Sequence, residues 1–154
     1  MKKTLTILFL CLTFIANAQE KVKLPAIVEA NFNKEFKEIN DVEWSVYYRG
    51  KYNKDLRFEA QFIKGNSKFL ISYTEDGIMK VIQKSIPINS LNDRIMDYLK
   101  DTYPTFEINE ASLIVKADQK SYYNVGISGS SNFFILVFSE EGYFLYLSPF
   151  GERI

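Results

Sequence analysis

The sequence predicts an α+β fold built from two tandem repeats, each with one helix packed on a four-stranded antiparallel sheet. Three observations support this fold class. The apolar residues twice change from helical spacing to strict alternation, several anchor positions match after a shift of 65 to 67 residues, and Gly77 and Gly142 each follow an acidic residue between two alternating runs. A helix followed by alternating runs with tight turns is typical of a helix that covers one face of a small antiparallel sheet.

The first predicted helix covers residues 24–36. Its apolar residues recur every three or four positions, and Pro25 suits the first turn of a helix. From Val42 the spacing changes to two, which predicts a half-buried strand. Further strands are predicted at 56–63, 68–74 and 78–84, and Asp76-Gly77 is expected to form a hairpin turn between the last two.

The same order of elements is predicted in the second half. Ser90 is expected to cap a helix, with Asp93 three residues later, and Pro104 is expected to end it. The alternating runs predict four more strands, at 109–117, 121–128, 132–139 and 143–148, the last two joined by a turn at Glu141-Gly142.

The two halves match directly at eight positions. A shift of 67 relates Leu24, Val28, Phe32 and Phe36 to Leu91, Ile95, Leu99 and Tyr103, and a shift of 65 relates Phe69, Ile71, Tyr73 and Gly77 to Phe134, Leu136, Phe138 and Gly142. An internal match of this length predicts a repeat. We therefore expect one unit over residues 19–87 and a second over 88–154.

The first 18 residues have the pattern of a secretory signal peptide. Lys2 and Lys3 precede the apolar run Leu5 to Ile15, and Ala16-Asn17-Ala18 offers small residues for cleavage before Gln19. Cys11 lies inside the apolar run and follows Leu10, whereas attachment of a lipid requires a small residue before the cysteine. Lipidation of Cys11 is therefore not expected. We expect an exported protein, periplasmic or secreted, with no membrane span after cleavage.

Cleavage would also remove the only cysteine of a chain that lacks most groups used in enzyme catalysis. The chain has no histidine, its single cysteine lies in the predicted signal, and no phosphate-binding or calcium-binding motif is present. We therefore expect no enzyme, no cofactor and no metal site. Residues 19–154 would carry 17 basic and 19 acidic side chains without a run of like charge, which argues against nucleic acid as a partner.

One alternative uses carboxylates. Glu43 and Glu59 are expected to point the same way from neighbouring strands, and a pair of acids can hydrolyse glycosides when correctly spaced. Arg57 and nearby lysines would be their neighbours, which favours an ordinary solvated sheet face. A carboxylate-dependent hydrolase therefore remains a minor alternative.

Aromatic and aliphatic side chains are more abundant than one helix-covered face requires. The run 133–138 is apolar at both odd and even positions. The repeat assigns Phe134, Leu136 and Phe138 to the helix-covered face, so Phe133, Ile135 and Val137 are expected to point away from the helix. That face is either buried within the protein or a homodimer, or it binds another molecule. Tyrosines offer large contact areas with a polar end. The candidate partner-binding residues are Tyr47, Tyr48, Tyr122, Phe133, Ile135 and Tyr146.

A family resemblance rests on a succession of short segments. They are Leu24-Pro25, Phe36, Asp41-Val42-Glu43-Trp44, Phe58-Glu59-Ala60-Gln61-Phe62, Tyr73-Thr74-Glu75-Asp76-Gly77 and Ile86-Pro87. This succession resembles the PepSY-like family of exported tandem-repeat proteins, which are named for a likeness to β-lactamase inhibitors. The second half departs from the pattern, with Glu110-Ala111-Ser112-Leu113 in place of the Val-Glu-Trp segment.

The resemblance implies a fold similar to the β-lactamase inhibitory proteins, whose open sheet face grips a target protein. It transfers no catalytic residue and no inhibitory contact. The leading hypothesis is an exported, non-enzymatic module that binds an unidentified protein or peptide and inhibits or regulates an exported enzyme. The alternative is a structural or accessory envelope protein that associates with itself, as a homodimer for example.

Overall fold

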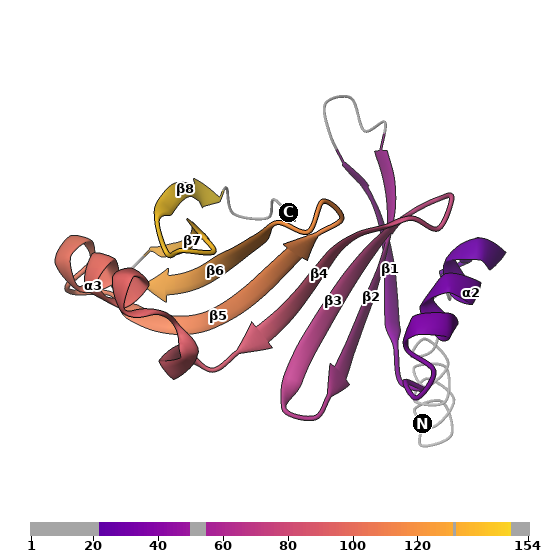
Figure 1. The fold of residues 1–154 in the computed structure, drawn as a ribbon, viewed down its shortest axis with the longest axis horizontal. Helices are drawn as coiled ribbons and strands as arrows, with labels where there is room; N and C mark the ends of the chain where they lie inside the picture. Colours follow the sequence, from indigo (N-terminus) through magenta and orange to yellow (C-terminus); the bar gives the residue numbers. More distant parts are fainter. Residues whose placement is uncertain (1–21, 50–54, 131, 149–154) are drawn as a thin grey trace, which may run out of the picture.

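The computed structural model describes residues 22–49, 55–130 and 132–148, so the predicted signal peptide and its cleavage site before Gln19 lie outside the described residues. Each predicted strand is present within a few residues of its expected position (Figure 1). The strands are β1 (Glu43–Arg49), β2 (Asp55–Lys64), β3 (Ser67–Thr74), β4 (Met79–Ile86), β5 (Glu107–Lys116), β6 (Ser121–Ser128), β7 (Phe133–Ser139) and β8 (Phe144–Ser148).

The eight strands form one antiparallel sheet in sequence order, from β1 to β8. The prediction of two repeats with separate four-stranded sheets was therefore wrong. The finding that overturns it is the pairing of β4 with β5, which runs from Val81 opposite Lys116 to Ile86 opposite Ala111. Backbone hydrogen bonds make this connection, so side-chain patterns within either half carry no information about it.

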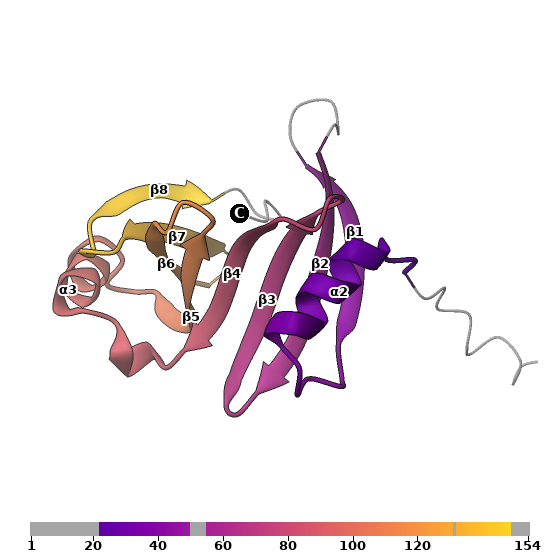
Figure 2. The same cartoon turned by 45° about the vertical axis from the view of Figure 1, so that its right-hand side comes forward.

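Two helices, α2 (Ala26–Glu35) and α3 (Asp93–Thr102), cover the same face of this sheet (Figures 1 and 2). Val28 and Phe32 of α2 pack against β2 and β3, and Ile95 and Leu99 of α3 pack against β6 and β7. The register shows that the two covered areas are on one side, because Ile82 belongs to the first cluster while Ile86, on the same side of β4, contacts the second. The sheet curves away from the helices (Figure 1).

The start of α3 differs from the prediction. Asn92, rather than Ser90, is the N-cap, and its side-chain oxygen accepts a hydrogen bond from the Ile95 amide at 3.0 Å. Ser90 lies in a short 3-10 turn, η2 (Ile88–Ser90), and its hydroxyl donates to the Pro87 carbonyl. Asparagine and serine are both favoured N-cap residues, and the prediction did not consider Asn92, two residues after Ser90.

Both predicted hairpin turns contain a glycine with positive φ, 78° at Gly77 and 86° at Gly142. Each turn also lies close to a helix. The Asn31 side chain of α2 donates to the Gly77 carbonyl at 3.0 Å, and a Cβ at Gly142 would overlap the Asn92 side chain at the start of α3. Glycine is therefore required at both turns for backbone conformation and for space.

Within the described ranges, no helix has the length and apolar character needed to cross a bilayer.

Tyr73 is the largest fully buried side chain under α2, and its hydroxyl has no hydrogen-bond partner among the described residues. Burial, with a smaller contribution from Glu35, raises the pKa of this phenol. Phe138 occupies the matching position under α3. Because an unsatisfied buried hydroxyl is costly, we expect Tyr73→Phe to raise the free energy of unfolding by about 1 kcal/mol at neutral pH.

The same substitution should have a larger effect in alkali. Above the ordinary tyrosine pKa, the unfolded chain loses the Tyr73 proton while the folded protein retains it, so the stability of the wild type falls as pH rises. Urea unfolding at pH 7 and pH 11 measures both effects, and the gain from Tyr73→Phe should widen at pH 11. A lower stability of the variant at both pH values would show that the hydroxyl has a stabilising partner.

Candidate functional site

The face of the sheet opposite α2 and α3, which we call the open face, carries the candidate site. Cross-strand pairing places side chains in rows across it. One row runs through Gln61, Leu70, Gln83, Ile114 and Tyr122 on neighbouring strands β2 to β6. Residues opposite one another in adjacent strands point to the same side, so this row belongs to a single surface.

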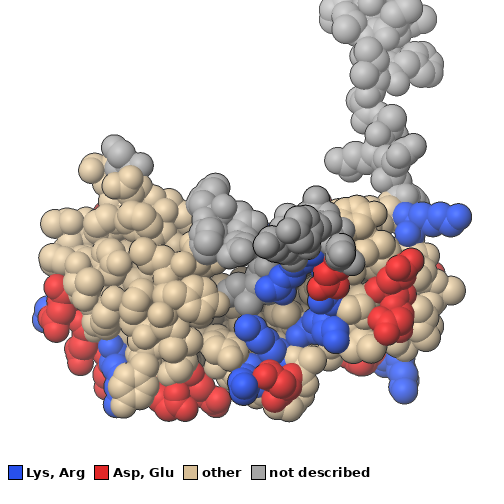
Figure 3. All heavy atoms as spheres, turned by 90° about the horizontal axis from the view of Figure 1, so that it is seen from above, with Lys and Arg blue, Asp and Glu red and all other residues tan. Residues whose placement is uncertain are grey.

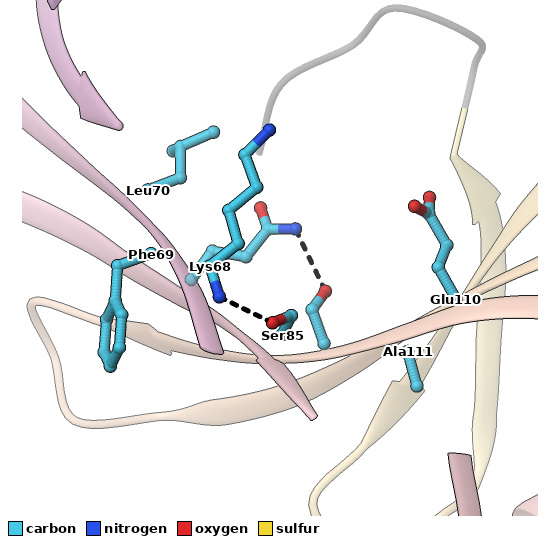
Figure 4. Close-up of a pocket in the computed structure, with 8 residues that line it drawn as sticks. Lys68, Phe69, Leu70, Ser85, Glu110 and Ala111 are labelled. Atoms are coloured by element: carbon cyan, nitrogen blue, oxygen red, sulfur yellow. Dashed lines mark hydrogen bonds between the residues drawn. The ribbon is translucent and has the colours of Figure 1, made fainter. Parts of the chain in front are cut away.

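A pocket of about 170 Å³ lies on the open face over β3, β4 and β5, toward the end of the sheet where β3 begins and β4 ends (Figure 4). Its floor is polar. The Gln83 side-chain amide donates to the Ser112 hydroxyl at 3.0 Å, and the Lys68 backbone amide donates to the Ser85 hydroxyl at 2.8 Å. Both serine hydroxyls accept a hydrogen bond in these contacts, so each can donate its own proton to a bound group.

Opposite charges stand on opposite walls of this pocket. Lys68 is on β3, Glu110 is on β5, both side chains are exposed, and both point out of the sheet on the open side (Figure 4). Neither forms an ion pair with another described residue. β3 and β5 are separated by one strand, roughly 10 Å in total, so the two charges can contact separate groups of a bound molecule.

Gly126 allows side chains to cross the open face beside the pocket. It lies opposite Glu110 in β6, and a Cβ there would come within 2.6 Å of the Glu110 Cγ and 3.0 Å of the Phe133 ring. A glycine inside a strand often marks such a close approach. Gly126 lies within the predicted strand 121–128, and the structure places it in β6, beside a register shift in β5 between Ile108 and Glu110.

The β5 to β8 part of the open face is aromatic and contains few charges. The Lys116 ammonium lies 4.6 Å from the centre of the Tyr122 ring, and the Asn124 side-chain oxygen is buried without a hydrogen-bond partner among the described residues. Figure 3 looks down on this side of the molecule: charged atoms gather over the β1 to β4 half, and uncharged atoms cover most of the other half.

The β1 to β4 part holds a polar network. Glu59, fully buried, accepts hydrogen bonds from the Ser45 hydroxyl at 3.4 Å and the Gln61 amide at 3.2 Å. Arg57 donates to Asp55 at 2.5 Å. Charged groups with little water around them depend on such partners, which suggests that these residues stabilise the sheet.

The two carboxylates considered for hydrolysis differ in their surroundings. Both Glu43 and Glu59 are on the open face, but Glu59 is buried among its hydrogen-bond donors, while Glu43 is exposed in a second pocket of about 360 Å³ with Asp41 and Lys68. Among residues 22–49, 55–130 and 132–148, no three acidic side chains gather closely enough to hold a metal ion.

The structure brings most of the predicted partner-binding residues to the open face. Tyr47 lies opposite Arg57, and the register places Tyr122, Phe133, Ile135 and Tyr146 on the same side. Tyr48, which is 61% exposed, points to the other side of β1. The prediction did not include the pocket residues Lys68, Gln83, Ser85, Glu110 and Ser112.

The sequence matches no protein-family model and no curated protein. Several solved structures have a fold similar to that of this chain. A BLIP-like protein (a protein similar to β-lactamase inhibitory protein) from Bacteroides fragilis superimposes with a TM-score of 0.64 over 86% of this chain and 91% of that chain, at 10% identity. The fold is BLIP-like.

Two further structures share the BLIP-like fold. A DUF2874 family protein from Bacteroides ovatus has a TM-score of 0.69 and 13% identity, over 82% of this chain and 88% of that chain. A protein from Bacteroides eggerthii that is described as periplasmic has a TM-score of 0.70 and 11% identity, over 82% and 89%. At such low sequence identities, the structural similarity establishes the fold alone. The BLIP-like fold implied by the resemblance is confirmed, while membership of the PepSY-like family stays a prediction.

Proposed function

We propose that this protein is an exported, non-enzymatic binding module that holds a protein partner against the β3 to β5 part of its open face. The observation that carries this proposal is the pocket over β3 to β5, whose lining mixes apolar and hydrogen-bonding side chains, with Lys68 and Glu110 on its opposite walls and no ion pair to either among the described residues. Pockets near the centre of an interface often receive the side chains that contribute most to binding.

The surroundings of the pocket also support a protein partner. Tyr122 and the exposed Tyr146 provide aromatic area on one side, and charged groups provide specificity on the other. A BLIP-like fold, a neighbour described as periplasmic, and the signal-like residues 1–18 favour action outside the cytoplasm. The partner we propose is an exported enzyme that the module inhibits or regulates. The two proteins would then meet in the periplasm or outside the cell.

Site-specific photocrosslinking tests the proposal in the exporting cell. A photoreactive phenylalanine analogue replaces Tyr122 on the open face, and in a matched control it replaces Asp97, an exposed residue of α3. We expect irradiation to yield one main adduct with an exported protein from position 122 and none from position 97. Adducts only from position 97, or none from either position at native expression, would contradict binding through the open face.

A further inference from the structure

β8 is an edge strand whose outer side has no strand partner among the described residues. It ends the sheet order and pairs only with β7, from Ile135 opposite Ser148 to Phe138 opposite Phe144 (Figure 2). The outward backbone groups of such a strand can hydrogen-bond to a strand from another chain.

The side chains of β8 do not oppose this pairing. Phe144–Ser148 contains no charge, proline or glycine, and Leu145, Tyr146 and Leu147 are 44–45% exposed. The opposite edge, β1, has Glu43 and Arg49 at its ends. Charges and irregularities are the usual protection of an edge strand. In β8 the only irregularity is a register shift near Leu145, which leaves 146–148 regularly paired with β7.

We propose that β8 pairs antiparallel with β8 of a second copy, around a two-fold axis at Tyr146. In this register Tyr146, on the open side, faces its own equivalent, and Leu147, on the helix side, lies opposite Leu145 of the second copy. A second copy fits because the uncharged strand is complementary to itself. A foreign strand of average composition would place charged residues against exposed leucines.

The pairing has a consequence for the open face. A two-fold axis perpendicular to paired edge strands keeps equivalent sheet faces on the same side, so both helix layers lie on one side and both open faces on the other. The pocket over β3 to β5 is distant from β8 in the sheet order and remains accessible. The dimer would therefore present two pockets in the same direction.

Sedimentation of protein purified from the exported fraction tests the association. A ladder of five residues is smaller than a standard interface of about 800 Å² per partner, so the measurement should extend from about 10 μM to about 1 mM. We expect the wild type to dimerise in this range, Leu147→Lys to weaken the dimer at least about tenfold, and Tyr48→Lys at the β1 edge to leave it unchanged. A wild type that stays monomeric, or a dimer that resists Leu147→Lys, would overturn the proposal.

Cysteine crosslinking tests the register without a destabilising charge. In a Cys11→Ser background, Tyr146→Cys places the only thiol on the proposed axis, where paired residues are within disulfide range. Mild oxidation should convert this variant to a covalent dimer, while Tyr48→Cys should stay monomeric. Equal crosslinking of the two variants would show random collision and contradict the register. A monomer that takes up an extended foreign peptide at β8 would assign the edge to another protein.

Discussion

Replacing Ile95 with alanine is expected to lower the free energy of unfolding by about 3 kcal/mol and to shift the unfolding of both ends of the sheet together. Ile95 is fully buried under α3, in the cluster that includes Val125 and Leu136. Truncating such a side chain removes apolar contacts and leaves a cavity. The effect should reach the far end because β4 and β5 pair along six residue positions.

Trp44 makes this prediction measurable because it is the only tryptophan of the chain and packs against Phe32 under α2, in the other cluster. Its fluorescence should follow the same shifted unfolding curve as far-ultraviolet circular dichroism. Met96→Ala, at a neighbouring position that is 37% exposed, is the control and should change stability by less than about 1 kcal/mol. A Trp44 transition that stays at its wild-type midpoint while the dichroism shifts would show that the halves unfold independently.

Much of the secondary structure could be predicted from local patterns. Alternation located the strands to within a few residues, and glycine after an acidic residue located both hairpin turns with positive φ. Errors came where two residue choices were physically equivalent. Ser90 and Asn92 are both good caps, and the structure selects Asn92 because the chain first makes a 3-10 turn.

The continuity of the sheet could not be predicted in the same way. β4 alternates Val81 and Gln83 on one side with Ile82 and Lys84 on the other, a pattern that suits an edge strand or a central strand equally well. Only backbone pairing with β5 decides between them. Once β4 and β5 are joined, the two predicted sheets become one curved surface.

The candidate site was predicted only in part for the same reason. Its open-face aromatics were found by strand parity, although Tyr47 and Tyr48 were grouped together when adjacent residues of a strand must point to opposite sides. The pocket residues Lys68, Gln83 and Glu110 come from three strands. Their proximity depends on the β4 and β5 pairing, so no local motif indicates it.

Charge reversal at the pocket should have the second large effect. Lys68→Glu and Glu110→Lys each place a repelling charge where the wild type offers an attracting one, so we expect each to weaken partner binding at least about tenfold, more at low salt. Both side chains are exposed, which should leave the fold intact. The matched controls are Lys100→Glu and Asp97→Lys on exposed positions of α3, which change the net charge equally.

The dissociation constant of the crosslinked partner, measured for these four variants and the wild type, tests the central claim most directly. The proposal of a partner seated over β3 to β5 predicts weaker binding for Lys68→Glu and Glu110→Lys, with wild-type binding for both α3 controls. Wild-type binding by both pocket variants, or equal losses in the α3 controls, would contradict it.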